Sequence, residues 1–391
     1  MLQFAWDAEV FTSNDAMPVV GMTRSTTIDA IDELIGLGLV RELPNARAVG
    51  EYRNGRPSRR FEFRSDGAVV VGIDAGRAHL TTIVADLRGR PLARETKETG
   101  SPEDSAEDRR RAIVDAVDSA LALAGHTRHD VIAACAGVPA PVDAEGRSPA
   151  HRDDFWRRMN PDLLGLLGEW APIVKVENDA SLAAVAEGSV GVATGHESFV
   201  SLLAGARLGA GVVVDGHLLR GAHGGAGEMV GFDHVLGVGE VGGIGYRLVE
   251  WAREAIAAGE IGPTHPLAML PADELTGRAV LELAHAGDAP ARSIVERAAA
   301  VLARVAGIFG SMYDPELIVV SGAIADGIGD VLAGARGMLP TELDLPAPEL
   351  VASTLGAEVV AIGAVSAAVE TARADLLRMI PLVQHRFTGE G

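Results

Sequence analysis

Two adjacent polar residues, Asn178 and Asp179, are placed where side chains often bind small molecules. They follow a predicted strand, Ile173 to Val176, and precede a predicted helix over Ser181 to Glu187. The carboxyl end of a strand that leads into a helix is where α/β proteins bind ligands. Asp179 would accept a proton from a hydroxyl group, and Asn178 offers a donor and an acceptor to a polyol. The alternative, commoner for such a fragment in isolation, is that one of them only caps the helix.

A glycine-rich stretch, Leu203 to Gly231, contains a third candidate residue, Glu228. It predicts a strand, a glycine turn, a second strand over Val212 to Val214 and a hairpin turn at Asp215-Gly216. Because glycine has no Cβ, three glycines of this stretch would let backbone amides approach a ligand closely: Gly205, Gly209 and Gly211. Taken alone, the stretch is equally compatible with an ordinary hairpin in a glycine-rich protein.

A third candidate carboxylate, Asp74, lies near a glycine after another predicted strand. Asp74 follows a buried-strand run, Ala68 to Ile73, and Gly76 comes two residues later. A carboxylate in this position suits a phosphate or magnesium site. The commoner alternative is a turn residue in a β-hairpin whose returning strand is Leu80 to Asp86. A further buried strand is predicted over Val131 to Val138.

The first 66 residues predict a small helical module with a basic edge. Gly21 ends one helix, and Thr23 is the expected N-cap of a second helix that runs from Arg24 to about Leu37. A strand over Arg60 to Phe63 follows a basic turn. This order is that of a winged helix-turn-helix. The residues expected to contact DNA lie at the helix start and in the wing: Arg24, Ser25, Thr26, Thr27, Arg56 and Arg59.

Charge is unevenly distributed along this acidic chain. The formal net charge is −20, which argues against a protein that coats nucleic acid or a membrane surface with its whole body. From Arg41 to Arg64, however, seven arginines stand against three glutamates, which gives +4. The second helix also carries Asp29, Asp32 and Glu33, which must face away from phosphate. The alternative is therefore a head that mediates association only.

Length and cysteine content restrict the remaining possibilities. The 391 residues suggest two or three domains. Cys135 is the only cysteine, so the sequence holds no intrachain disulfide and no cysteine cluster for zinc. Residues 1 to 20 lack the pattern of a signal peptide, and no apolar run is long enough to cross a membrane. We therefore expect a cytoplasmic protein without a membrane partner.

Six segments of the chain resemble motifs of the ROK family (repressors, open reading frames, kinases), and they are spread so that the resemblance extends over nearly the whole chain. Four lie in the body of the chain: VGIDAGRAHLTTIVADLRG (71–89), GVPAPVD (137–143), VENDASLAAVAEG (176–188) and LGAGVVVDGHLLRGAHGGAGE (208–228). The last is similar to the family signature and is specific. Two more, TRSTTIDAIDELIGLGLV (23–40) and GRPSRRFEF (55–63), resemble the DNA-binding module of repressor members, which the free kinases lack.

The resemblance implies an α/β protein with an actin-like, two-lobed ROK domain over residues 67–391 behind a winged helix-turn-helix domain over residues 1–66. Lobe 1 would comprise about 67–190 and a C-terminal helix over about 363–380, and lobe 2 about 191–362. Asn178, Asp179 and Glu228 would bind a sugar, with Asp179 as the base in kinase members. Four residues would match the segments that hold ATP phosphates: Asp74, Gly76, Gly205 and Gly209.

Two departures from the family pattern bear on function. Arg207 replaces a small residue in the phosphate loop, where its guanidinium would fill the nucleotide site or contact phosphate. The cysteines of the family's zinc loop are absent after Glu228, and His234 alone is a poor zinc site, so no bound metal is expected. ATP and magnesium are expected only if the chain is a kinase.

Three functions follow, in order of preference. The first is a sugar-responsive repressor that binds double-stranded operator DNA as a homodimer or homotetramer, with a small sugar or sugar phosphate as effector. The second is an ATP-dependent, glucokinase-like sugar kinase with a vestigial DNA-binding head. The third is a sugar-binding protein whose head contacts another protein. Binding to a promoter would indicate the first function, phosphorylation of a sugar the second, and binding to a partner protein but not to DNA the third.

Overall fold

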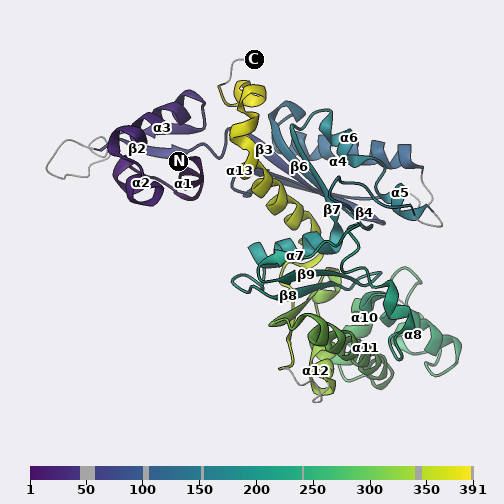
Figure 1. Cartoon of the computed structure of the whole chain (residues 1–391). Coiled ribbons are helices and arrows are strands. Elements are labelled where there is room, and N and C mark those ends of the chain that lie inside the picture. Colours follow the sequence, from purple (N-terminus) through teal and green to yellow (C-terminus); the bar gives the residue numbers. More distant parts are fainter. Residues whose placement is uncertain (45–57, 100–104, 151–153, 240–241, 340–345, 389–391) are drawn as a thin grey trace.

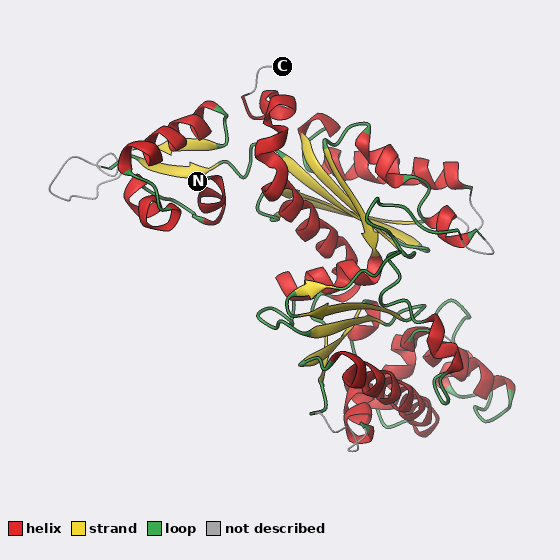
Figure 2. Cartoon of the chain, viewed as in Figure 1, coloured by secondary structure: helices red, strands yellow, loops and turns green. Residues whose placement is uncertain are grey.

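The computed structural model describes residues 1–44, 58–99, 105–150, 154–239, 242–339 and 346–388, with the backbone alone for 381–386 and 388. Figure 1 shows a small N-terminal unit beside a larger body, and Figure 2 shows that the body contains two β-sheets with helices around and between them. Arg56 and the turn around it lie outside the described residues, so the predicted wing has no structural account.

The described part of the N-terminal unit consists of short helices and an antiparallel pair of strands. Their bounds are α1 (Leu2–Asp7), α2 (Ser13–Val20), α3 (Arg24–Gly36), β1 (Val40–Leu43) and β2 (Arg60–Phe63). Gly21 ends α2 with φ +66°, and the Thr23 side chain accepts a hydrogen bond from the amide of Thr26 as the N-cap of α3. Trp6 stacks on Phe63 in the core of the unit. The expected break, cap and strand are therefore confirmed.

The first sheet of the body has the strand order β5-β4-β3-β6-β7, in which β3, β6 and β7 are parallel. Its strands are β3 (Val69–Ala75), β4 (His79–Asp86), β5 (Pro91–Glu98), β6 (Val131–Val138) and β7 (Ile173–Asn178). Alternate residues of β3 face opposite sides: Val69 and Val71 pack with α4, whereas Val70 packs with α13. The helices on the outer side are α4 (Ala106–Leu123), η2 (Arg128–Asp130), α5 (Phe155–Met159) and α6 (Leu163–Gly168).

The second sheet has the order β10-β9-β8-β11-β12, with β8, β11 and β12 parallel. Its strands are β8 (Phe199–Leu203), β9 (Gly209–Val214), β10 (His217–Leu218), β11 (Leu317–Ser321) and β12 (Glu349–Ala352). The helical elements of this half are η3 (Val230–His234), α8 (Ile244–Ala257), α9 (Pro266–Met269), α10 (Gly277–His285), α11 (Ala289–Tyr313), η4 (Ala323–Ala325), α12 (Gly329–Met338) and η5 (Gly356–Glu358). They enclose an apolar cluster on the side of the sheet away from α7.

Two helices, α7 (Asp179–Ser189) and α13 (Val359–Thr388), lie between the sheets. α13 packs on β3 and β6, and α7 packs on α13 and on β9. The two helices meet at backbone distance, since a Cβ on Gly363 would lie 1.9 Å from the carbonyl oxygen of Leu182. This contact requires glycine and leaves no space for a side chain between them.

α13 is longer than the helix predicted over about 363–380, because its last turns pack against the N-terminal unit. Phe387 is buried, and its backbone and ring contact the positions of Gly38 and Gly67. A guanidinium Nη1 of Arg64 donates to the carbonyl oxygens of Phe387, at 2.8 Å, and Gly38, at 3.2 Å. Figure 1 shows α13 extending from the region of α7 toward the N-terminal unit.

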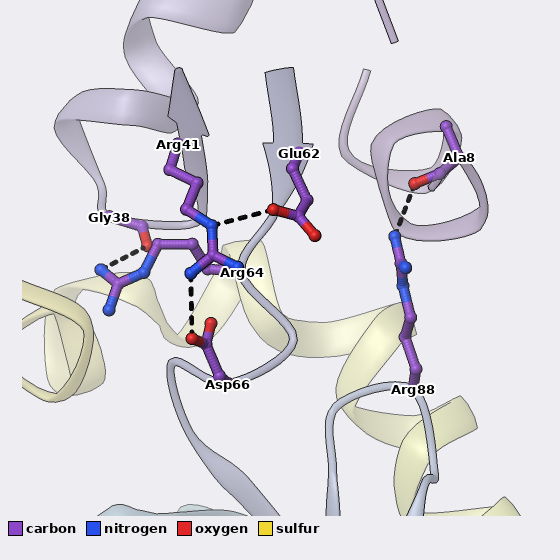
Figure 3. A network of polar contacts seen from close by, with 7 residues as sticks. All are labelled: Ala8, Gly38, Arg41, Glu62, Arg64, Asp66 and Arg88. Carbon is purple, nitrogen blue, oxygen red and sulfur yellow. Dashed lines mark hydrogen bonds and ion pairs between the residues drawn. The ribbon is translucent and has the colours of Figure 1, made fainter. Parts of the chain in front are cut away.

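A second arginine fixes the N-terminal unit from the side of the first sheet. Arg88, in the turn after β4, donates to the carbonyl oxygens of Trp6, at 3.0 Å, and Ala8, at 2.5 Å. Figure 3 shows the contact of Arg88 with Ala8, the contact of Arg64 with Gly38, and Arg41, which pairs with Glu62 and Asp66. Hydrogen bonds from charged donors to carbonyl groups are stronger than neutral ones. The unit is thus held to the body at α13 and at this turn.

Gly38 tests how strongly the N-terminal unit depends on α13. Its φ of +76° disfavours any other residue, and a Cβ there would lie 2.7 Å from the carbonyl oxygen of Phe387. Gly21 has a similar φ of +66° but open space around it. We expect Gly21→Ala to cost ~1–2 kcal/mol of unfolding free energy from backbone strain alone, and Gly38→Ala to cost clearly more. Urea unfolding measures both variants, and equal losses would contradict the tight contact with Phe387.

Candidate functional site

The predicted sugar-binding residues come together between the two sheets. Asn178 ends β7, Asp179 begins α7, and Glu228 forms an isolated bridge with Gly209 at the start of β9. The side-chain amide of Asn178 donates to Glu228 Oε1 at 3.5 Å and to the carbonyl oxygen of Ala140 at 3.1 Å. Asn178 Oδ1 accepts from the amide of Ser181 at 3.0 Å, so Asn178 is also the helix N-cap. The capping role weighed from the sequence is confirmed, and the sugar-binding role of Asn178 stays a prediction.

The charges of two other carboxylates affect Asp179 in this site. Burial, followed by the charges of Asp74 and Glu228, raises the pKa of Asp179 to about 8. Burial also raises the pKa of Glu228, and the nearby charge of Arg207 opposes that change. Asp179 is therefore mostly protonated at neutral pH and donates a hydrogen bond in that state, whereas above pH 8 it becomes a base.

Asp74 and Gly76 belong to a tightly held turn between β3 and β4. Asp74 is buried, and its Oδ2 lies 3.1 Å from Nε2 of His79, a hydrogen bond that raises the pKa of His79. A Cβ on Gly76 would lie 2.9 Å from the carbonyl oxygen of His79. The geometry of the turn therefore accounts for both residues, and the charge of Asp74 contributes to the raised pKa of Asp179.

Arg109 supports this turn and was not among the residues singled out in the sequence. It projects from α4 into the core and donates to the carbonyl oxygens of Ala75, Gly76 and Met159. Burial lowers the pKa of its guanidinium to about 10. The signal for it is its position four residues before Ile113, on the buried face of the helix.

Gly209 and Gly211 have a structural role that Gly205 does not share. A Cβ on Gly211 would lie 2.3 Å from the carbonyl oxygen of Ala180, and one on Gly209 would lie 3.1 Å from the Ala180 Cβ. Both glycines therefore let β9 pack closely on α7, whether or not a ligand is present. Gly205 has open space around its Cα, but its carbonyl oxygen accepts the amide of Tyr246 at the start of α8.

A cavity of about 310 Å³ opens beside Glu228. Its lining combines cationic, aromatic and apolar side chains with that carboxylate: Arg77, Pro139, Phe155, Trp156, Arg158, Arg207, Glu228 and Val230. Arg77 belongs to the β3–β4 turn and Arg207 to the loop before β9, so segments from both sheets form its wall. Of these residues, Glu228 and Arg207 were given individual roles from the sequence, and the others were not predicted to line the site.

The residues predicted to contact DNA differ in exposure. Arg24, Ser25 and Thr26 are exposed at the start of α3. Thr27 is buried, and its hydroxyl donates to the carbonyl oxygen of Thr23 at 2.9 Å, so it stabilises the helix start instead of facing outward. Arg59 pairs with Asp32 at 2.9 Å and with Glu42 at 2.8 Å. Contact with phosphate would require Arg59 to exchange these partners.

Metal-binding clusters and membrane-spanning helices are both absent from the described residues. The described residues contain no group of three or more His, Cys, Asp or Glu side chains arranged to hold a metal ion. Cys135 lies buried in β6, and burial raises the pKa of its thiol to about 12. None of the described helices is long and apolar enough to cross a membrane.

The match to known proteins covers the body of the chain. The ROK family model matches residues 70–370. This chain belongs to the ROK family. The xylose repressor of Bacillus subtilis (strain 168) is 25% identical over 214 residues, which are 54% of this chain and 53% of the repressor. The chain spans 39% to 61% of the length of several curated relatives.

Two solved structures have the same fold as this ROK protein. A ROK family glucokinase from Streptomyces griseus, in complex with glucose and AMPPNP, is 27% identical and aligns with a TM-score of 0.63 over 77% of this chain and 99% of the glucokinase. A ROK family transcriptional regulator, a homologue of the E. coli MLC protein, aligns with a TM-score of 0.71 over 95% of this chain and 94% of the regulator at 20% identity. The body therefore has the actin-like sugar-kinase fold with mixed sheets.

The raised pKa of Asp179 predicts how stability changes with pH. The folded chain keeps this proton up to about pH 8, whereas the unfolded chain releases it near pH 4, so stability falls as the pH rises through that window. Asp179→Asn removes the effect. We expect the variant to gain stability over the natural chain, with a gain that grows from pH 5 to pH 8 and then levels off at a few kcal/mol.

Urea unfolding at several pH values measures this gain. Asp273→Asn, at an exposed position, is the control and is expected to give almost no gain at any pH. A difference for Asp179→Asn that stays constant with pH would show that the carboxyl group is not desolvated.

Proposed function

We propose that this ROK protein is a sugar-responsive, DNA-binding transcriptional repressor of carbohydrate uptake or catabolism genes. The observation that carries the proposal is the attachment of a helical N-terminal unit to the end of α13, a helix that also contacts α7 beside the candidate sugar site. A ligand in the cleft and DNA at the N-terminal unit would thus act on the same helix. The xylose repressor relative and the alignment with a ROK regulator over 95% of the chain support this choice.

The N-terminal unit is proposed to be a winged helix-turn-helix domain over residues 1–66, with the ROK domain over 67–391. In support, α2, the left-handed Gly21 and α3 form two helices joined by a tight turn, and β1 and β2 follow as an antiparallel pair. The exposed start of α3, with Arg24, Ser25 and Thr26, would enter the major groove. Arg56 keeps its sequence-based role as the wing residue.

The proposed coupling runs through packed elements with little freedom. Asn178 and Asp179 lie at the start of α7, and Leu182 contacts Gly363 of α13 at backbone distance. α13 then ends at Phe387 against Gly38. Because packed helices shift as units between discrete arrangements, a ligand that moves α7 would move the N-terminal unit. In a homodimer or homotetramer this motion would change the spacing of paired recognition helices on operator DNA.

Binding to DNA upstream of the chain's own gene tests the regulator. We expect binding that weakens steeply as salt increases, since phosphate contacts dominate affinity. Arg24→Ala should weaken binding several-fold and lower the slope of log affinity against log salt by about 1, as expected for one lost phosphate contact. Fluorescence anisotropy with labelled DNA measures both quantities.

The matched control is Arg292→Ala, which removes an exposed arginine from α11 in the second half of the body. It should leave affinity and salt slope unchanged. Absence of any complex at low salt, or equal losses for the two variants, would rule out the proposed DNA surface.

A second candidate is an ATP-dependent sugar kinase. The observation in its favour is Asp179, whose pKa of about 8 is close to the value that suits a general base, and the glucokinase of known structure is a relative at 27% identity. Against it, Arg207 lines the cavity, and the amides of Gly243, Gly245 and Tyr246 already donate to the carbonyl oxygens of residues 204–206. These three amides are therefore already satisfied by protein carbonyl groups and do not point at a triphosphate.

A coupled assay with ATP, magnesium and common hexoses separates the two functions. For the proposed repressor we expect ADP release no faster than for Asp179→Asn, because no phosphoryl transfer depends on this carboxylate. Sugar-dependent ADP release that the Asp179→Asn substitution abolishes would overturn the ranking and identify a kinase.

A further inference from the structure

Three guanidinium groups lie around one small cavity. Arg77 from the β3–β4 turn, Arg158 from α5 and Arg207 from the loop before β9 all line the 310 Å³ space beside Glu228. These residues are far apart in the sequence, and the fold brings them together at the cleft. A chain with a formal net charge of −20 therefore presents a locally cationic wall at its candidate ligand site.

Two other arginines of the body, Arg109 and Arg220, are bound to protein groups. Arg109 donates to three carbonyl oxygens, and Arg220 lies 2.8 Å from the buried carboxylate of Glu177. Within the described ranges, by contrast, no protein group forms a hydrogen bond or ion pair with the guanidinium of Arg77 or Arg207, and both residues are exposed. Two of the cleft arginines are therefore available to a ligand.

The acidic side of the cleft does not cancel this charge at neutral pH. Glu228 lines the cavity, but Asp179 is mostly protonated, and the Asp74 carboxylate is engaged by His79. An anion that enters the cavity therefore meets guanidinium groups with few ionised carboxylates beside it. Planar guanidinium groups also match the geometry of carboxylate and phosphate oxygens.

The remaining lining indicates the size and shape of the ligand. The volume is at the lower end of the 300–1,000 Å³ that is usual for small-molecule sites. Phe155 and Trp156 offer flat apolar surfaces to a sugar ring, and Glu228, which accepts a hydrogen bond from Asn178, offers an acceptor to a hydroxyl group. This combination suits one monosaccharide with an acidic substituent.

We propose that the ligand of this cleft is an anionic monosaccharide, a sugar acid or a sugar phosphate, whose negative group is held by Arg77, Arg158 and Arg207. The inference rests on the proposed function, because it takes the cleft to be the effector site. It narrows the effector from any sugar to one that carries a carboxylate or a phosphate.

Ligand binding to the full chain tests the proposal with matched probes. Thermal shift and isothermal titration calorimetry would compare glucose, glucuronate, glucose 6-phosphate and inorganic phosphate with sodium chloride at equal ionic strength. We expect at least one anionic sugar to bind about tenfold or more tightly than glucose, as charged hydrogen bonds allow. If glucose binds as tightly, or if no anion stabilises the chain more than sodium chloride does, the proposal is wrong.

Substitutions then show which side chain holds the anion. Arg207→Ala should weaken the anionic sugar about tenfold, and Arg207→Lys should recover part of the loss because it keeps the charge without the planar fork. Arg157→Ala is the control, since Arg157 is exposed on the same helix as Arg158 but does not line the cavity. Equal effects of Arg207→Ala and Arg157→Ala would overturn the assignment.

Two further arms separate this proposal from the others. AMPPNP with magnesium is titrated into the same variants, and binding that depends on Arg207 for AMPPNP but for no anionic sugar would assign the arginines to a nucleotide and overturn the proposal. DNA binding is measured on the same preparations. Loss of DNA binding with intact anion binding would refute the regulator alone, and the reverse result would refute the anionic ligand alone.

Discussion

The backbone contact between α7 and α13 is the constraint on which the rest of this structure depends. Gly363 and Leu182 approach so closely that any side chain at residue 363 would overlap the Leu182 carbonyl group. Because both helices are also packed between two sheets, neither moves without the other. One end of this pair carries the candidate ligand residues Asn178 and Asp179, and the other end carries Phe387, which packs against the N-terminal unit. The fold thus joins its two candidate binding surfaces mechanically.

The electrostatics of the cleft agree with this arrangement. A protonated Asp179 can donate to a sugar oxygen at neutral pH, and Asn178 bridges Glu228 and the β6 side of the site. Arg207 lies close enough to Glu228 to oppose the effect of burial on its pKa. Arg207 and Glu228 therefore place opposite charges in the wall of one cavity.

Local patterns in the sequence were sufficient to predict a strand, cap or turn where the segment interacts mainly with residues close to it in the chain. The buried strand over Val131 to Val138, the Thr23 cap, the break at Gly21 and the hairpin turn at Asp215-Gly216 were predicted as observed. β5 was not predicted. It lies at the edge of the sheet, its residues are exposed or half-buried and many are charged, so the segment has little apolar pattern.

Features that depend on residues far apart in the chain could not be predicted from local sequence patterns. The extension of α13 to Thr388 is stabilised by the N-terminal unit, some 300 residues away in the chain, and nothing in the local residues indicates it. The glycine at 211 was attributed to a ligand but is required by Ala180. Arg59 was assigned to DNA, yet it pairs with Asp32 and Glu42, which approach only in the folded unit. The gathering of Arg77, Arg158 and Arg207 likewise requires the complete fold.

Genome-wide mapping of the DNA bound by this protein in its own cells tests the central claim most directly. The account predicts a small set of discrete sites beside genes for the uptake or breakdown of carbohydrates, and their loss when Arg24 is replaced by alanine. A map without sites above the background of a strain that lacks the protein would contradict a DNA-binding regulator, whatever ligand occupies the cleft.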